Sequence, residues 1–275
     1  MTDTRPEGLQ KIKHIVAVAS GKGGVGKSTT TVNVALAMAK AGFKVGVLDA
    51  DIYGPSQGLM LGIAEGSHPE TMDEKWFVPI QAHGVSVMSM AFLVDANTPM
   101  VWRGPMAAGA LQQMLLQTAW GELDYLFVDM PPGTGDIQLT LCQKAQVSGA
   151  IIVTTPQDLA LLDARKGIVM FNKVNVPVLG IVENMSTHVC SQCNHEEAIF
   201  GAGGGAALAQ EYGSELLASL PLSMAIRVLV DSGTPTVVAE PQSAAANTYM
   251  QLAHSLVEKL DGTTQSMPSI SIDED

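Results

Sequence analysis

The chain has 275 residues, of which 47% are apolar and 15% are charged, and its formal net charge is −12. This composition is typical of a packed globular protein, and the length suffices for one large α/β domain. No basic stripe or long apolar run is present, which disfavours both nucleic acid, whose binding needs clustered Lys and Arg, and a bilayer span of roughly 20 residues.

Strand-like and helix-like segments alternate along the whole chain. Strands are predicted at residues 14–19, 44–48, 85–90, 125–128, 150–154, 178–182 and 215–220, and helices at residues 29–41, 106–118, 137–145, 159–173, 206–212 and 243–260. Near-continuous apolar strands between amphipathic helices predict a mostly parallel central sheet with helices on both faces. We expect one domain over residues 13–261, between a tail at residues 1–12 and an acidic tail at residues 262–275.

The most informative motif is a phosphate-binding loop after the first predicted strand. Residues 21–28 read Gly-Lys-Gly-Gly-Val-Gly-Lys-Ser and match G-x-x-x-x-G-K-[ST], between a strand and a helix as the motif requires. Glycines let backbone N–H groups approach phosphate, Lys27 is expected to reach the β- and γ-phosphates, and the Ser28 hydroxyl is expected to bind Mg²⁺. The expected nucleotide contacts are Gly21, Lys22, Gly23, Gly24, Val25, Gly26, Lys27, Ser28 and Thr29.

Carboxylates follow two other predicted strands. Asp49 and Asp51 end the second strand, two residues apart, and could hold a Mg²⁺-bound water and orient the attacking water. Asp129 ends the strand at residues 125–128, at the Walker B position beside the metal. Alternatively, Asp51 caps a short helix that starts near Tyr53, and Asp129 caps a turn. After Asp129, two prolines and two glycines form a loop able to sense the γ-phosphate.

Asn184 follows the predicted strand at residues 178–182. Its side-chain amide offers both a donor and an acceptor, which is what pairing with adenine needs. We therefore expect Asn184 to contact the base, and the alternative is an asparagine that only shapes a turn.

The chain has three cysteines, too few for a disulfide framework, and its N-terminus lacks the apolar core of a signal peptide, so a cytoplasmic protein is expected. Cys190 and Cys193 have C-x-x-C spacing, which lets two thiolates meet at one metal. Three completions are open: zinc with His188 and His195, a redox dithiol, or four thiolates from two chains holding zinc or an iron–sulfur cluster. Cys142 lies among apolar residues and is expected in the core.

Lys22 is a second lysine that an ordinary phosphate loop does not need. The run K-G-G-V-G-K-S-T resembles the deviant Walker A motif shared by the nitrogenase iron protein and the partitioning ATPases. The resemblance implies an ATP-bound dimer in which Lys22 contacts the phosphates of the partner subunit. It also implies that Asp51, in D-x-D-x-x-x-P-S, places or activates the nucleophile, and that Asp49 supports it.

Taken together, the motifs S-G-K-G-G-V-G-K-S-T, D-A-D-I-Y-G-P-S, D-M-P-P-G-T-G-D, E-N-M-S and C-x-x-C resemble the Mrp/ApbC family of iron–sulfur cluster carrier ATPases. The resemblance implies a homodimer that holds a labile [4Fe–4S] cluster between Cys190 and Cys193 of both chains. The cluster would pass between assembly scaffolds and apo-proteins, with ATP hydrolysis gating loading or release. Two alternatives remain: a zinc-bridged dimeric regulatory ATPase, and a spatial organiser of the partitioning type.

Overall fold

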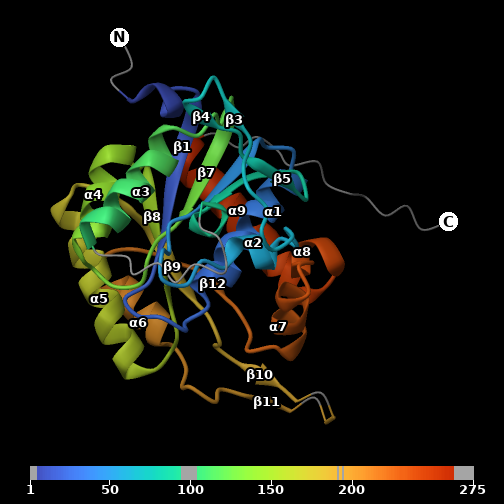
Figure 1. Ribbon diagram of the computed structural model, residues 1–275. Coiled ribbons are helices and arrows are strands. Elements are labelled where there is room, and N and C mark those ends of the chain that lie inside the picture. Colours follow the sequence, from blue (N-terminus) through green and yellow to red (C-terminus); the bar gives the residue numbers. More distant parts are fainter. Residues whose placement is uncertain (1–4, 94–103, 191, 194, 263–275) are drawn as a thin grey trace.

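A single mixed sheet forms the centre of the protein (Figure 1). The computed structural model describes residues 5–93, 104–190, 192, 193 and 195–262. In this part of the chain eight strands pair in the order β12-β9-β8-β1-β7-β2-β6-β5, and every neighbouring pair is parallel except β5 with β6. The strands are β1 (Ile12–Ala19), β2 (Val45–Asp49), β5 (Ile80–Ala82), β6 (Val85–Ser89), β7 (Leu123–Asp129), β8 (Gly149–Thr154), β9 (Val178–Glu183) and β12 (Leu216–Ser219).

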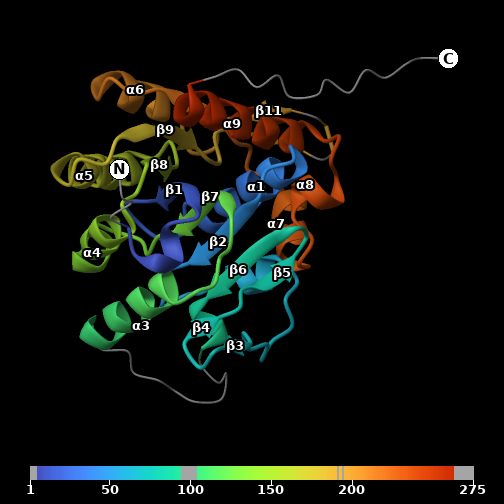
Figure 2. The same ribbon diagram turned by 90° about the horizontal axis from the view of Figure 1, so that it is seen from above.

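Helices cover both faces of this sheet. Figure 2 shows α3, α4 and α5 on one face and α1 and α9 on the other. Because of this double cover, every residue of β2 and β8 is buried, which explains why both strands are apolar up to their last residue. The predicted fold class is confirmed. The helices are α1 (Lys27–Lys40), α2 (Gln57–Met60), α3 (Gly104–Leu116), α4 (Asp136–Ala145), α5 (Asp158–Lys173), α6 (Gly204–Glu211), α7 (Met224–Asp231), α8 (Thr236–Ala239) and α9 (Ala244–Asp261).

Several elements at the edges differ from the prediction. The antiparallel strand β5 and the helices α2, α7 and α8 were not predicted as such, whereas Trp76 and Phe77, expected in a hairpin, do form one as β4 (Trp76–Phe77) with β3 (Thr71–Met72). The tail predicted at residues 1–12 is in part structured, because a 3₁₀ turn over Glu7–Leu9 buries Leu9 completely and β1 already begins at Ile12. The acidic tail predicted at residues 262–275 lies outside the described residues apart from Gly262.

The strand register brings the predicted site residues together at one edge of the sheet. Asp129 at the tip of β7 is paired with Asp49 at the tip of β2 and with Val18 near the end of β1. The loops that follow β1, β2 and β7 therefore meet at the carboxyl ends of three adjacent strands, where ligands bind in parallel sheets.

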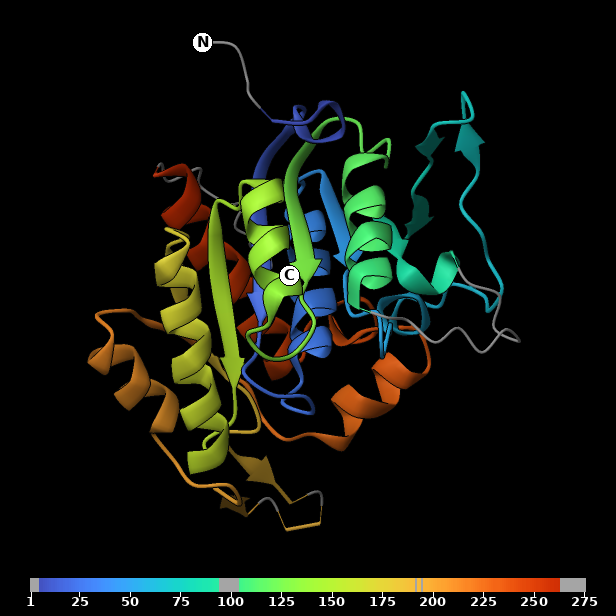
Figure 3. The same cartoon turned by 60° about the vertical axis from the view of Figure 1, so that its left-hand side comes forward.

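A small antiparallel hairpin, β10 (His188–Val189) with β11 (Glu196–Glu197), follows β9. Figure 3 shows this hairpin, in gold-brown, beyond the tip of the arrow of β8, so it projects from the same end of the sheet as the phosphate loop. The cysteine pair lies at the turn of this hairpin.

Candidate functional site

The phosphate loop has the geometry that its sequence predicts. It connects the end of β1 to the start of α1, and both Gly24 and Gly26 have positive φ, 81° and 82°. A side chain at Gly26 would in addition place its Cβ 2.0 Å from the Asn184 side-chain nitrogen. Gly26 thus satisfies a backbone requirement and a packing requirement that other residues do not meet.

A cavity of about 200 Å³ opens over this loop, of a size that admits part of a nucleotide. Its wall combines the glycine loop, the first residues of α1, the segment after β2 and a proline of the segment after β7. The lining residues are Ser20, Gly23, Gly24, Gly26, Lys27, Ser28, Thr29, Asp51, Ser56, Met60 and Pro132.

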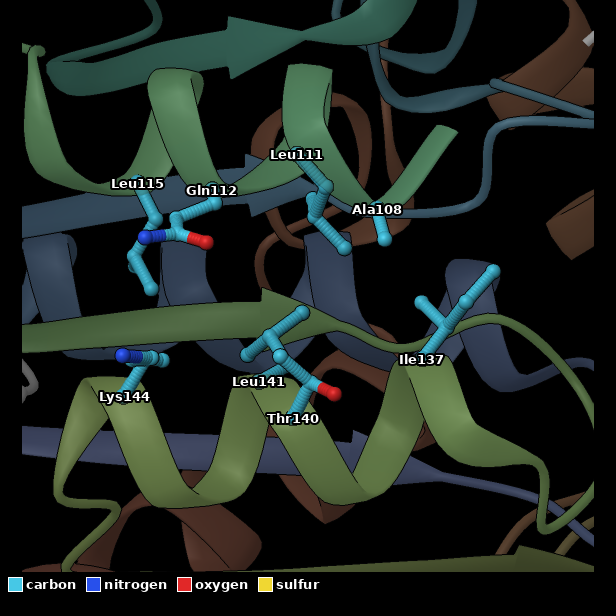
Figure 4. Close-up of a pocket in the computed structure, with 8 residues that line it drawn as sticks. All are labelled: Ala108, Leu111, Gln112, Leu115, Ile137, Thr140, Leu141 and Lys144. Atoms are coloured by element: carbon cyan, nitrogen blue, oxygen red, sulfur yellow. The ribbon is translucent and has the colours of Figure 1, made fainter. Parts of the chain in front are cut away.

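A second crevice, of only about 10 Å³, lies between α3 and α4 (Figure 4). Figure 4 shows the side chains of Leu111, Leu115, Ile137 and Leu141 directed into the space between the two helices. This space is about the size of one water molecule and is too small for a nucleotide or a cofactor.

Lys27 forms a buried ion pair across the site. Its ammonium group donates to Asp129 Oδ1 and lies 3.2 Å from Ser28 Oγ, and the lysine is only 6% exposed. Asp129 is fully buried and also accepts from the Thr31 hydroxyl at 3.2 Å. A phosphate that draws the lysine toward itself must therefore take it away from this carboxylate.

Asp49 lies behind the cavity wall and organises the backbone that follows β2. Its Oδ2 accepts from the backbone N–H groups of Ser56 and Gln57, at 2.8 and 2.9 Å, and from the Ser89 hydroxyl at 3.1 Å. Burial, together with repulsion by Asp129, raises the pKa of Asp49 to about 7, against the lowering effect of these backbone donors and of Lys27.

Asp51 is half-buried and lines the cavity itself. The alternative that it caps a helix starting near Tyr53 is wrong, because α2 begins at Gln57 with Ser56 as the N-cap residue. Gln57 is fully buried in the site, and sequence analysis missed it: it follows the D-x-D-x-x-x-P-S motif, and only the fold shows what its side chain contacts.

The buried side chain of Asn184 is hydrogen-bonded to the phosphate loop. Its Nδ2 donates to the Val25 carbonyl at 2.9 Å, and its backbone N–H binds the Thr154 carbonyl. The next residue, Met185, has a φ of 57°, a left-handed conformation that is uncommon outside glycine. The segment is fixed again at Thr187, whose carbonyl accepts a hydrogen bond from the backbone N–H of Leu222. A short, closely held segment thus runs from the phosphate loop to the cysteine hairpin.

The two cysteines of the hairpin are accessible, Cys193 more so than Cys190. The N–H of Cys190 donates to the His195 carbonyl at 2.9 Å, which closes the turn. Hydrogen bonds from the backbone N–H groups of Gln192 and Cys193, and from the Cys193 side chain, lower the pKa of the Cys190 thiol. This arrangement favours the thiolate, the form that binds metals.

Among the described residues, no group of three or more His, Cys, Asp or Glu side chains is arranged to hold a metal ion. His188, which the zinc alternative requires, lies with its Nδ1 3.1 Å from the Leu222 carbonyl. Cys142 is buried in the core as predicted, and burial raises the pKa of its thiol to about 11.

Lys22 is half-buried and is not among the residues that line the cavity of its own chain. Its carbonyl accepts the Ser20 hydroxyl at 2.8 Å, which fixes the entry of the loop. Gly133, in the segment after β7, donates its N–H to the Ser20 carbonyl, so that this segment is joined to the phosphate loop.

Comparison with known proteins agrees with this geometry. The family model described as NUBPL iron-transfer P-loop NTPase (ParA) matches residues 11–257. The chain belongs to this family. The iron-sulfur cluster carrier protein of Pseudomonas fragi is 68% identical over 246 residues, 90% of this chain and 86% of that protein. The iron-sulfur cluster transfer protein NUBPL of Mus musculus is 47% identical over 259 residues, 94% of this chain and 81% of that protein.

Solved structures of P-loop proteins share the fold. A nucleotide-binding protein from Archaeoglobus fulgidus, in complex with ADP, has a TM-score of 0.74 and 40% identity, and the match covers 86% of this chain and 92% of that one. The septum site-determining protein MinD of Pyrococcus horikoshii, complexed with Mg-ADP, has a TM-score of 0.68 over 90% of this chain and 97% of that one; its 24% identity shows the fold alone.

The protein is therefore a P-loop ATPase of the iron-transfer class, as its motifs predict. No helix in the described part of the chain combines the length and the apolar character that crossing a bilayer requires.

Proposed function

We propose that this protein is an ATP-dependent carrier of iron–sulfur clusters. Two chains pair, Cys190 and Cys193 of both hold one labile [4Fe–4S] cluster as cargo, and the cluster passes from assembly scaffolds to apo-proteins. The observation that carries the proposal is a thiol pair, Cys193 exposed and Cys190 half-buried, on a hairpin at the same end of the sheet as the phosphate loop, with backbone donors favouring the Cys190 thiolate. A [4Fe–4S] cluster takes four thiolates. One chain provides two of them, and a second chain related by a twofold axis provides the other two.

The residues of the ATP site suit the binding and hydrolysis of ATP that this function requires. The donor set of Ser28 hydroxyl and Asp129 carboxylate fits Mg²⁺, which prefers few protein oxygens and keeps its other positions for phosphate and water. A Mg²⁺ ion held by Ser28 and Asp129 would offset the negative charge of the nucleotide phosphates. Lys27 leaves Asp129 for the phosphates, and Asp51, at the cavity wall, orients the attacking water. Lys22 reaches the phosphates of the partner subunit, and Asn184 contacts adenine.

We infer that the segment between Asn184 and the hairpin couples the ATP site to the cysteine pair. Movement of the phosphate loop on ATP binding pulls on the Asn184 amide, which holds the Val25 carbonyl. Met185 has a strained backbone conformation, and we expect a change in its dihedral angles to pass this movement on to the hairpin that carries Cys190. Because the thiolates must stay reduced, the cytoplasm is the compartment in which we expect the protein to act.

Anaerobic reconstitution with iron and sulfide tests the proposal. We expect a broad visible absorption band and iron and sulfide in equal amounts, both lost in Cys190→Ser and Cys193→Ser and retained in Cys142→Ala, the matched control in the core. Transfer to an apo [4Fe–4S] ferredoxin should require the loaded protein. Stoichiometric zinc with no bound iron would favour the zinc-bridged alternative, and binding of neither metal would overturn the carrier function.

A further inference from the structure

Gln57 joins three separate parts of the ATP site. Its Nε2 donates to the Ser28 carbonyl at 3.0 Å and to Asp129 Oδ2 at 2.9 Å, and its backbone N–H donates to Asp49 Oδ2 at 2.9 Å. The side chain is fully buried at the start of α2. A single residue thus links the phosphate loop, the tip of β7 and the tip of β2.

The side-chain amide of Gln57 leaves one atom without a partner. Its Oε1 is buried and finds no donor among the described residues. Turning the amide over would place this oxygen against two other acceptors, so the orientation is fixed by the surroundings. An unpaired buried acceptor is unfavourable, and an apolar side chain of similar length would avoid it. The contribution of the glutamine therefore lies in its two N–H donors.

The two oxygens of the Asp129 carboxylate bind different partners. Gln57 occupies Oδ2, whereas Oδ1 accepts from Lys27 and Thr31. The same Lys27 ammonium lies 3.2 Å from Ser28 Oγ. With Oδ2 held by Gln57, the carboxylate keeps Oδ1 directed toward Lys27, beside the Ser28 hydroxyl.

We propose that Gln57 is a positioning residue for the Mg²⁺–nucleotide site. It fixes the Asp129 carboxylate and the Ser28 backbone in the geometry that receives the metal, and it acts through them because it does not line the cavity. Its backbone bond to Asp49 also ties this geometry to the segment that carries Asp51. The inference rests on the proposed Mg²⁺ site at Ser28 and Asp129.

Equilibrium binding of a fluorescent ADP analogue, with Mg²⁺ or with EDTA, tests this role without relying on turnover. In the unaltered protein Mg²⁺ should tighten binding. In Gln57→Met the affinity in EDTA should stay the same, and the gain from Mg²⁺ should fall about 10- to 100-fold, as for other residues that orient metal ligands. Gln57→Asn, one methylene too short to bridge both acceptors, should lose the same gain.

Thr236→Val is the matched control, because the Thr236 hydroxyl is also buried with no partner among the described residues but lies in α8. It should retain the full Mg²⁺ gain. A purely structural role for Gln57 predicts equal weakening with and without Mg²⁺, together with a lower melting temperature, and that result would overturn the inference. An undiminished gain in both Gln57 variants would overturn it as well. If the unaltered protein shows no Mg²⁺ gain, the proposed metal site itself fails.

Discussion

Removing the Lys27 ammonium should destabilise the protein even when no nucleotide is present. In Lys27→Met the aliphatic part of the side chain is kept, but Asp129 loses its buried partner. Breaking such a pair from one side typically costs about 3–5 kcal/mol, because a buried charge is left uncompensated. Thr31 and Gln57 still donate to Asp129, so we expect the lower end, about 3 kcal/mol. For a chain of this size, that lowers the melting temperature by roughly 6–12 °C.

Urea unfolding in EDTA, without nucleotide, measures this cost. The double variant Lys27→Met/Asp129→Asn removes both charges and should be more stable than the sum of the single changes predicts, by about 1–3 kcal/mol. Lys44→Met is the matched control, since Lys44 pairs with Glu122 at the surface, and it should cost less than about 1 kcal/mol. If Lys27→Met unfolds within about 1 kcal/mol of the unaltered protein, the reasoning about the buried pair is refuted.

Gly26→Ala should abolish nucleotide binding in equilibrium dialysis, because both its φ of 82° and the nearby Asn184 amide exclude a Cβ, whereas Gly109→Ala, with open space around it, should bind normally. Asp51→Ala should bind ATP with nearly unchanged affinity but hydrolyse it about 100-fold more slowly or worse; normal turnover would remove its proposed role. Asp261→Asn should destabilise the protein by about 1–2 kcal/mol at pH 7, since its partner Lys13 is largely exposed and the pair is screened by solvent; in urea titrations the difference should close as the pH falls through about 2.

The surroundings of Asp261 stabilise its ionised form. Burial opposes the charged form, but hydrogen bonds from Lys13, Tyr125 and His14 outweigh it and lower the pKa of Asp261 to about 2. The ionised form therefore stabilises the fold at pH values above the unfolded pKa near 4, and this contribution is lost as the pH falls through about 2. A difference between the two proteins that persisted unchanged at pH 2 would contradict this explanation.

The elements that the sequence predicts are those whose pattern is local. The central strands are covered on both faces and so carry near-continuous apolar runs, and the phosphate loop is a contiguous motif between a strand and a helix. The tips of these strands then bring Asp49 and Asp129 together by register alone. This much of the fold and the site is fixed by periodicity and by the rules of parallel sheets.

The remaining features depend on contacts between distant segments. Strand β5 is a three-residue antiparallel edge, too short to carry a pattern of its own. Gln57 reads as an ordinary polar residue until α2 brings it against Asp129, 72 positions away. That Asn184 holds the Val25 carbonyl likewise follows from the neighbouring positions of β1, β8 and β9 in the sheet, which no spacing along the chain reveals.

Native mass spectrometry of the anaerobically reconstituted protein tests the central proposal, a cluster shared between two chains, most directly. We expect one dominant species with the mass of two chains plus a single Fe₄S₄ unit, and its conversion to cluster-free chains when Cys190 or Cys193 is replaced by serine. A single chain that carries a whole cluster, or a dimer that carries one cluster in each chain, would contradict the account.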